Sequence, residues 1–144
     1  MLTITDFSPN DLADLAARLT DDDRAELVAA GLTVECLEGV PAQALRWHGE
    51  LVCLFGAVPQ PSGAAVPWMM CTRTLRKVPK RQMAETARRV VNDWQAQYPK
   101  LINFVHRHHG SALRFLHWLG FSIDRTPNGP GGNFFIFTWE RANV

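Results

Sequence analysis

The sequence predicts a single α+β domain built on a mixed, largely antiparallel sheet. Its 144 residues suit one domain, and the hydrophobic fraction of 47% is ordinary for a protein with a core of its own. Three consecutive segments with strand character precede a long amphipathic helix, and a strand–bend–helix–strand unit and a last strand follow it. Hairpins give antiparallel pairs and helical crossovers give parallel ones, so this order places both kinds of pairing in one sheet.

The first thirty residues predict a strand and two helices. Residues 2–7 alternate apolar and polar side chains, as a half-buried strand does. Ser8 and Pro9 then start a helix, because serine caps well and proline suits the first helical position. Thr20, or the aspartate after it, caps a second helix over residues 24–30, which a glycine ends.

Three consecutive aspartates at residues 21–23 lie at the start of that second helix. Negative charge is favourable at the positive end of a helix dipole, so we interpret them as helix electrostatics rather than as a metal site. Residues 32–39, beyond the helix, fit either a short third helix or a loop.

A group of three antiparallel strands is expected next. Apolar segments at residues 42–47 and 51–59 flank a His-Gly-Glu turn, which is the pattern of a β-hairpin. Residues 64–72 form the third strand, after a turn rich in proline and glycine. Pro67 lies inside this strand and lacks an N–H, so it indicates a bulge or a sheet edge.

The central unit of the chain is a short strand followed by a short helix. Before it, residues 80–98 form the longest expected helix, which begins after Pro79 and ends at a second proline. Residues 101–105 are a short apolar run typical of a buried strand. A histidine-rich bend then leads to a helix over residues 111–119 with one apolar stripe, and Gly120 caps its end.

The C-terminal part predicts a turn and a last strand. Residues 124–132 are dense in proline and glycine and indicate a mobile turn, and residues 133–140 form the strand after it. Several aromatic residues at strand or helix spacing are expected in the core: Trp118, Phe134, Phe135 and Trp139.

Composition argues against some classes of protein. No apolar run approaches the roughly 20 residues of a membrane span, and the N-terminus lacks the features of a secretory signal. The cysteines are odd in number and widely spaced, which fits buried, reduced thiols of a cytoplasmic protein rather than a disulfide framework. They are Cys36, Cys53 and Cys71.

Charge is divided unevenly along the chain. Residues 1–50 carry ten acids and three Lys or Arg, a net charge of −7, whereas residues 51–144 carry four acids and twelve Lys or Arg, a net charge of +8. A basic cluster lies between the third strand and the long helix, and it consists of Arg73, Arg76, Lys77, Lys80 and Arg81. Free backbone N–H groups at a helix start add to this positive potential, so we expect an anion site there, with phosphate as its usual guest. The alternative is a solvated basic helix face.

Three histidines follow the buried strand: His106, His108 and His109. A metal site needs ligands that converge from several elements, and no Cys, Asp or Glu adjoins these histidines in the sequence. We therefore expect no metal, and either a polar cleft lining that relays a proton or a plain surface bend. The sequence contains neither a nucleophile elbow nor a glycine-rich phosphate loop.

Residues 109–121, HGSALRFLHWLGF, resemble a segment of the GNAT acetyltransferase superfamily. That segment reads Asn-x-x-Ala-hydrophobic-x-hydrophobic-Tyr-x-x-hydrophobic-Gly-Phe. The positions that fit are Ala112, Leu113, Phe115, Leu119, Gly120 and Phe121. Residues 67–137 are also similar to a short GNAT-like family of tailed phages, which includes internal virion proteins. The shared motifs are Trp-Met-x-Cys-Thr at 68–72, Leu-x-Asn-x-Val at 101–105 and Leu-x-Trp-Leu-Gly-Phe at 116–121.

The resemblance implies a single GNAT-like α+β domain over residues 1–144, with helices on both faces of a largely antiparallel sheet. It also implies acetyl-coenzyme A in a V-shaped gap between the strands at 64–72 and 101–105, with the pyrophosphate on the connector 73–81. The thioester carbonyl would accept a backbone N–H near Cys71. The implied cofactor-binding residues are Cys71, Thr72, Arg73, Arg76, Lys77, Lys80, Arg81 and His109.

The chain departs from the family pattern at several positions. Its connector lacks the glycines that let a backbone approach a pyrophosphate closely, and Pro79 removes one amide donor. The family's Asn position is His109. The family's Tyr position, often the acid that reprotonates the coenzyme thiolate, is Leu116, which has no proton to give.

Two functions follow from these observations. The first is an acetyl-coenzyme A-dependent N-acetyltransferase that acts on an amine, with His48, Glu50, His106 and His108 as unranked candidates for the base. The second is a catalytically inactive GNAT-fold phage protein, either a virion component or a host-interaction protein. The expected location is the cytoplasm, or the host cytoplasm or virion for a phage protein, and a homodimer is one expected assembly. Nucleic-acid binding through residues 73–89 is a weaker third function, which a steep salt dependence would reveal.

Overall fold

The computed structural model describes residues 1–142, and they form one seven-stranded sheet with helices on both faces. The strands are β1 (Leu2–Asp6), β2 (Gln43–Trp47), β3 (Glu50–Pro59), β4 (Ala65–Cys71), β5 (Lys100–His106), β6 (Ser122–Asn128) and β7 (Phe134–Glu140). The α-helices are α1 (Pro9–Arg18), α2 (Asp21–Ala29), α3 (Lys80–Gln97) and α4 (Gly110–Trp118). Short 3-10 helices lie at η1 (Val34–Leu37), η2 (Arg73–Lys77) and η3 (Pro130–Gly132).

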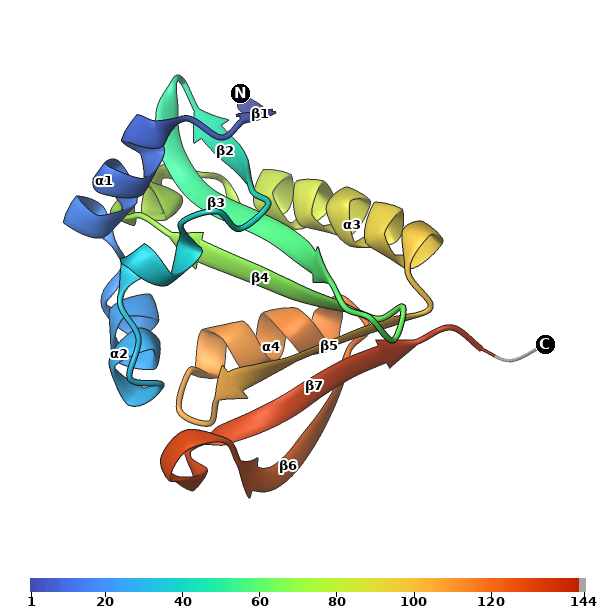
Figure 1. Ribbon diagram of the computed structural model, residues 1–144. Coiled ribbons are helices and arrows are strands. Elements are labelled where there is room, and N and C mark those ends of the chain that lie inside the picture. The colour runs from blue at the N-terminus through green and yellow to red at the C-terminus, as the bar shows by residue number, and fades with distance from the viewer. Residues whose placement is uncertain (143–144) are drawn as a thin grey trace.

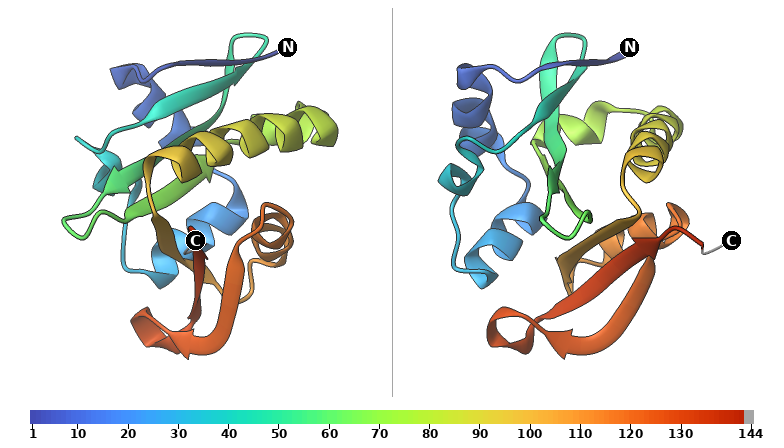
Figure 2. Two further views of the ribbon diagram at one scale, coloured as in Figure 1. Left: turned by 90° about the vertical axis from the view of Figure 1, so that its right-hand side faces the viewer. Right: turned by 45° about the vertical axis from the view of Figure 1, so that its right-hand side comes forward.

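The sheet has the order β1-β2-β3-β4-β5-β7-β6 (Figure 1). Every neighbouring pair is antiparallel except β4 and β5, which are parallel. Helices α1 and α2 cover one face, and α3 and α4 cover the other, as Figure 2 shows. The predicted α+β class, with a mixed and largely antiparallel sheet, is confirmed.

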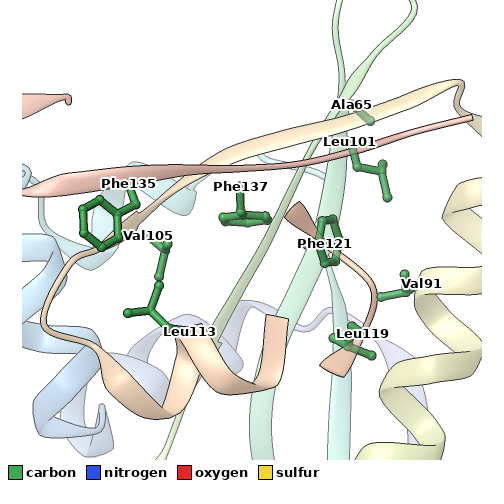
Figure 3. Packing of buried hydrophobic residues seen from close by; sticks show 9 residues of the cluster. All are labelled: Ala65, Val91, Leu101, Val105, Leu113, Leu119, Phe121, Phe135 and Phe137. Atoms are coloured by element: carbon green, nitrogen blue, oxygen red, sulfur yellow. The ribbon is translucent and has the colours of Figure 1, made fainter. Parts of the chain in front are cut away.

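Three groups of buried apolar side chains hold these layers together. One lies between the sheet and α1–α2 and contains Leu15, Leu51 and Leu54, each at most 1% exposed. A second packs β2–β4 against α3. The third joins the β5–β7–β6 half of the sheet to α3 and α4 (Figure 3), and its nine buried residues include Leu101, Leu113 and Phe137. Each face of the sheet therefore has its own core.

Local signals in the sequence account for where the helices begin and end. The backbone N–H of Ser8 donates to Asp11 Oδ2 at 2.8 Å at the start of α1, and Thr20 Oγ1 accepts the N–H of Asp23 at 3.3 Å at the start of α2. Because Thr20 is the cap, α2 begins at Asp21, three residues earlier than predicted. Gly120, with φ of +96°, ends α4 as expected.

The prediction of a mobile turn at residues 124–132 was wrong in part. Strand β6 continues to Asn128, with an irregular register against β7, and only Gly129 to Gly132 form the turn. The reason is that Pro127 lies on an edge strand, where one missing N–H is tolerated. Proline and glycine density alone did not distinguish an edge strand from a loop.

Two further expectations about burial were wrong. Cys36 is exposed, in η1, while Cys53 and Cys71 are buried as predicted. Trp118 is 50% exposed, because the neighbouring Leu119 takes the core position at the end of α4. The indole of Trp118 instead carries the Arg88 guanidinium over its ring, 4.3 Å from the centroid.

Candidate active site

The sheet opens between β4 and β5. The two parallel strands are paired at Ala65 and Leu101 and then diverge, so that Figure 1 shows a V-shaped gap that widens towards α2. The side chain of Asn103 closes the narrow end, because its Nδ2 donates to the carbonyl of Pro67 at 2.8 Å. The two strands diverge beyond this contact. Pro67 lies neither at a sheet edge nor at a bulge, because β4 is the fourth of seven strands and its register against β3 is regular. The proline is tolerated there because its nitrogen points towards β5, where no ladder bond is lost.

The strand register decides which backbone groups face the gap. Thr72 N donates to Val52 O on β3 at 2.8 Å. Because backbone N–H groups alternate in direction along a strand, those of Met69 and Cys71 point away from β3, towards β5. Pro67 shares this orientation but has no N–H. On the β5 side, the N–H groups of Phe104 and His106 face the gap.

Three of these four inward N–H groups are already bonded. Cys71 donates to Asp23 Oδ2 at 2.7 Å, His106 to Glu26 Oε1 at 2.9 Å and Phe104 to the side chain of Asn103 at 2.7 Å. Within residues 1–142, the N–H of Met69 is the one inward strand donor without a partner. A carbonyl placed in the gap would find its backbone donor there.

Helix α2 joins the two diverging strands at their far ends. Asp23 bonds to β4 and Glu26 to β5, and Thr20 N donates to Cys71 O at 2.9 Å just before the helix. Asp23 is 7% exposed, and its burial raises the pKa of that carboxyl, with the Cys71 N–H as the main opposing influence. We call Asp23 and Glu26 with their two strand contacts the α2 latch.

His109, at the start of α4, contacts the same latch. Its Nδ1 lies 3.1 Å from Glu26 Oε2, and its Nε2 lies 3.7 Å from Asp22 Oδ2. The hydrogen bond to Glu26 raises the pKa of His109, burial opposes this, and the charges of Glu26, Asp23 and Asp22 add to the increase. His109, for which the family resemblance implied cofactor binding, thus lies beside the acids of α2.

This pKa predicts how stability changes with pH. The folded state holds the His109 proton more tightly than the unfolded state, so its contribution is complete below the unfolded pKa of about 6.5 and is lost as pH rises through the higher folded value. We expect the free energy of unfolding to fall across this range, and His109→Gln to remove that part of the fall. Urea denaturation of both proteins from pH 6 to 8 measures it, and equal slopes would contradict the prediction.

Structure brings together a possible ligand set that the sequence did not show. Ligand atoms of Asp23, Glu26 and His109 lie within 4.8 Å of one another. Sequence reasoning found no acid near the histidines, because Glu26 is 83 positions away from His109. In the folded protein these groups bond to strand N–H groups and to each other. The rings of the other two histidines of the bend, His106 and His108, are tilted by 50° to each other, with their centroids 5.5 Å apart.

Side-chain hydrogen bonds hold the connector after β4 in place. The Thr72 hydroxyl, fully buried, donates to Leu51 O and accepts the N–H of Thr74 at 3.2 Å. Thr74 Oγ1 in turn accepts Arg18 Nη1 at 2.7 Å and donates to Glu50 Oε2 at 3.0 Å. Glu50, a sequence candidate for the base, therefore anchors the connector, and the hydroxyl of Thr72 is occupied inside the fold.

The basic cluster lies on this connector and on the first turn of α3. Lys77 pairs with Glu50 at 3.2 Å and Arg81 with Glu85 at 3.0 Å, both on the surface. The remaining three cations are exposed and make no ion pair within residues 1–142: Arg73, Arg76 and Lys80. The acidic first half of the chain therefore pairs with one cation of the cluster, Lys77, through Glu50, and leaves these three cations unpaired.

The start of α3 adds backbone donors to this positive surface. Pro79 is the N-cap and supplies no side-chain acceptor, and no acid lies in the first turn. The first intrahelical bond is from Met83 N to Pro79 O at 3.1 Å, so the N–H groups of residues 80–82 are free. The sequence predicted that Pro79 would remove one amide donor. Because Pro79 precedes the helix, it leaves the three free N–H groups of residues 80–82 in place.

Known proteins were compared with the chain. No protein-family model matches the sequence, and no curated protein matches it. An aminoglycoside acetyltransferase in complex with coenzyme A matches the structure with a TM-score of 0.69 at 14% identity, over 98% of this chain and 95% of that one. The spermidine N-acetyltransferase of Vibrio cholerae, in complex with CoA and spermine, gives 0.68 at 11% identity, over 96% and 95%. An acetyltransferase of the GNAT family from Streptococcus pneumoniae gives 0.59 at 11% identity, over 98% and 100%.

This chain has the GNAT fold. The expected GNAT-like architecture is thereby confirmed across nearly the whole chain. Within the GNAT fold, the gap lies between β4 and β5, where the sequence resemblance implied it. No helix in residues 1–142 is long and apolar enough to cross a membrane.

Proposed function

We propose that this protein is an acyltransferase that takes the acyl group of a coenzyme A thioester, acetyl-coenzyme A in the first instance, and passes it to an amine. The observation that carries the proposal is the divergence of β4 from β5, followed along the chain by a cationic connector and an uncapped helix start. The coenzyme A complexes of two structures with the same fold support it.

The pyrophosphate would bind at the start of α3. The three free N–H groups of residues 80–82 and the helix dipole favour an anion there. The unpaired cations of the connector, Arg73, Arg76 and Lys80, add charge that no carboxylate of residues 1–142 cancels. Cationic side chains would thus replace the glycines that the family uses at this position.

The thioester would lie in the gap along β4. The free N–H of Met69 would donate to the thioester carbonyl and stabilise the oxyanion that forms on attack by the amine. The N–H of Cys71, nearer the mouth, is held by Asp23, so it is not available unless α2 moves. Catalysis in this proposal rests on positioning and on this one donor.

The attacking amine must lose a proton. Glu26 and His109 form the ionisable pair at the open end of the gap, 3.1 Å apart. In this proposal the pair takes the role of general base. The sequence candidates His48 and Glu50 do not, because they lie at the β2–β3 turn, where Glu50 is paired with Lys77. Leu116, on α4, cannot protonate the departing thiolate, so in this proposal water supplies that proton.

The α2 latch and Leu116 also favour a second function, a catalytically inactive GNAT-fold protein of tailed phages, either a virion component or a host-interaction protein. In that case the two acids would serve only to close the sheet. Measuring the melting temperature with acetyl-coenzyme A separates the two functions. A ligand at 100 times its Kd adds about 2.7 kcal/mol, which raises Tm by roughly 8 °C for a chain of this length. No shift at millimolar concentration would leave the inactive protein as the better account.

The anion site has its own test. We expect Lys80→Glu with Arg81→Glu to abolish the thermal shift with coenzyme A, because both side chains flank the free N–H groups of α3. Arg114→Glu with Arg125→Glu is the matched control, since it makes the same charge change at exposed positions on α4 and β6. A shift that survives in the first double variant would remove those two residues from the site.

A further inference from the structure

An apolar cavity lies beside the gap, on the face of the sheet covered by α3 and α4. Its volume is about 110 Å³. Met69 on β4, Ala87 and Val90 on α3, and Phe115 and Leu116 on α4 contribute to its wall. The cavity therefore lies where three elements of the candidate active site meet.

The chemistry of the wall defines what can enter. Among residues 1–142, no charged side chain lines the cavity, and the one hydroxyl in its wall, that of Thr86, accepts a hydrogen bond from Arg89 Nη2 at 3.5 Å. A ligand with amide or carboxylate groups would lose its hydrogen bonds to water there and gain none. The occupant that fits is a hydrocarbon group.

The size of the cavity limits that group. An apolar cavity of about 150 Å³ accepts benzene and excludes water, so a cavity of about 110 Å³ suits a chain of roughly four to six carbons with modest adjustment of its wall. Two of the wall residues, Met69 and Met83, are methionines, whose flexible side chains make such adjustment easy.

Met69 connects this cavity to the reaction proposed above. Its backbone N–H faces the gap, whereas its side chain lines the cavity. A thioester whose carbonyl accepts that N–H therefore has its acyl carbons next to the cavity. Leu116, at the position where the family has a tyrosine, makes this wall apolar instead of placing a hydroxyl there.

We propose that the cavity binds the acyl chain of the donor, and that the preferred donor is a short-chain acyl-coenzyme A of about four to six carbons rather than acetyl-coenzyme A. This inference rests on the proposed acyltransferase function. It replaces the acetyl group that the resemblance implies with a longer acyl group, which the fold alone does not specify.

Calorimetric titration with coenzyme A, acetyl-, butanoyl- and hexanoyl-coenzyme A tests the inference. Each buried methylene favours binding by a factor of about four, so butanoyl-coenzyme A should bind on the order of tenfold more tightly than acetyl-coenzyme A. Equal affinities for the acetyl and butanoyl esters would overturn this inference and leave the proposed function standing. Absence of binding by all four compounds would overturn both.

A pair of variants on α3 locates the preference. Ala87→Leu places a larger side chain in the cavity wall and should reduce the ratio of butanoyl to acetyl affinity to about one. Ala84→Leu, on the same helix but outside the wall, should keep the wild-type ratio. A preference that survives in Ala87→Leu would contradict the assignment. The wild-type series decides the question independently if Ala87→Leu does not fold.

Discussion

Replacing Asp23 with alanine is expected to destabilise the protein by about 3 kcal/mol, because the change leaves the buried N–H of Cys71 without an acceptor. A hydrogen bond from a buried N–H to a charged acceptor stabilises a fold by about 1.5–3 kcal/mol, and an orphaned donor costs a similar amount. The helix cap itself survives, since Thr20 Oγ1 accepts the backbone N–H of residue 23, which alanine retains. Urea denaturation at pH 7 measures the difference.

Asp22→Ala is the matched control for this change. Asp22 occupies the same first turn of α2, but its side chain is 69% exposed and lies 3.7 Å from His109. Its loss should cost less than about 1 kcal/mol, the usual range for a charge near a helix start. Asp23→Asn keeps an oxygen for the Cys71 N–H and should fall between the two. Equal destabilisation by Asp22→Ala and Asp23→Ala would show that helix electrostatics, and not the latch, is what matters.

Most of the fold could be predicted because its signals are local. The alternation of β1, the capping of α1 by Ser8 and the glycine after α4 each depend on a few neighbouring residues. The one parallel pair followed from a helical crossover between strands. Where local signals conflicted, as for the proline and glycine in residues 124–132, the prediction was wrong in part because the edge position of β6 is a property of the whole sheet.

The latch could not be predicted, because it joins residues that are far apart in sequence. Asp23 and its partner Cys71 are 48 positions apart. One signal did exist: Asp23 precedes Leu27 by four positions, so the two share a helix face, and Leu27 is 5% exposed. An aspartate on a buried face requires a partner, whereas the interpretation from helix electrostatics treated residues 21–23 alike.

The gap between β4 and β5 thus offers few free backbone donors. Its strands diverge, but acids from α2 and the amide of Asn103 accept hydrogen bonds from three of its four inward N–H groups. The backbone N–H of Met69 is the donor that remains free in the gap, and the side chain of the same residue lines the apolar cavity. Both proposals about chemistry therefore converge on this one residue, and a variant there is the strongest test of the mechanism.

Met69→Pro is expected to lower the rate of acyl transfer about 10²- to 10³-fold, the cost of removing one oxyanion donor, while the protein still folds. Proline lacks the N–H, and at residue 69 this N–H makes no ladder bond to β3, since the register points it into the gap. The sheet already tolerates Pro67 two positions earlier, with the same orientation. The measurement is the rate of thiol release from acyl-coenzyme A in the presence of amine acceptors, together with the far-ultraviolet circular dichroism of the variant.

Met69→Ala separates the donor from the side chain. It keeps the N–H and removes only the part of Met69 that lines the cavity, so the rate should stay far closer to wild type than in Met69→Pro. Coenzyme A, which has no thioester carbonyl, should raise the melting temperature of wild type and Met69→Pro equally, because its pyrophosphate binds at α3. A folded Met69→Pro protein that binds coenzyme A and transfers acyl groups at the wild-type rate would show that the oxyanion donor lies elsewhere. The Cys71 N–H, freed by movement of α2, would then be the remaining backbone candidate on β4.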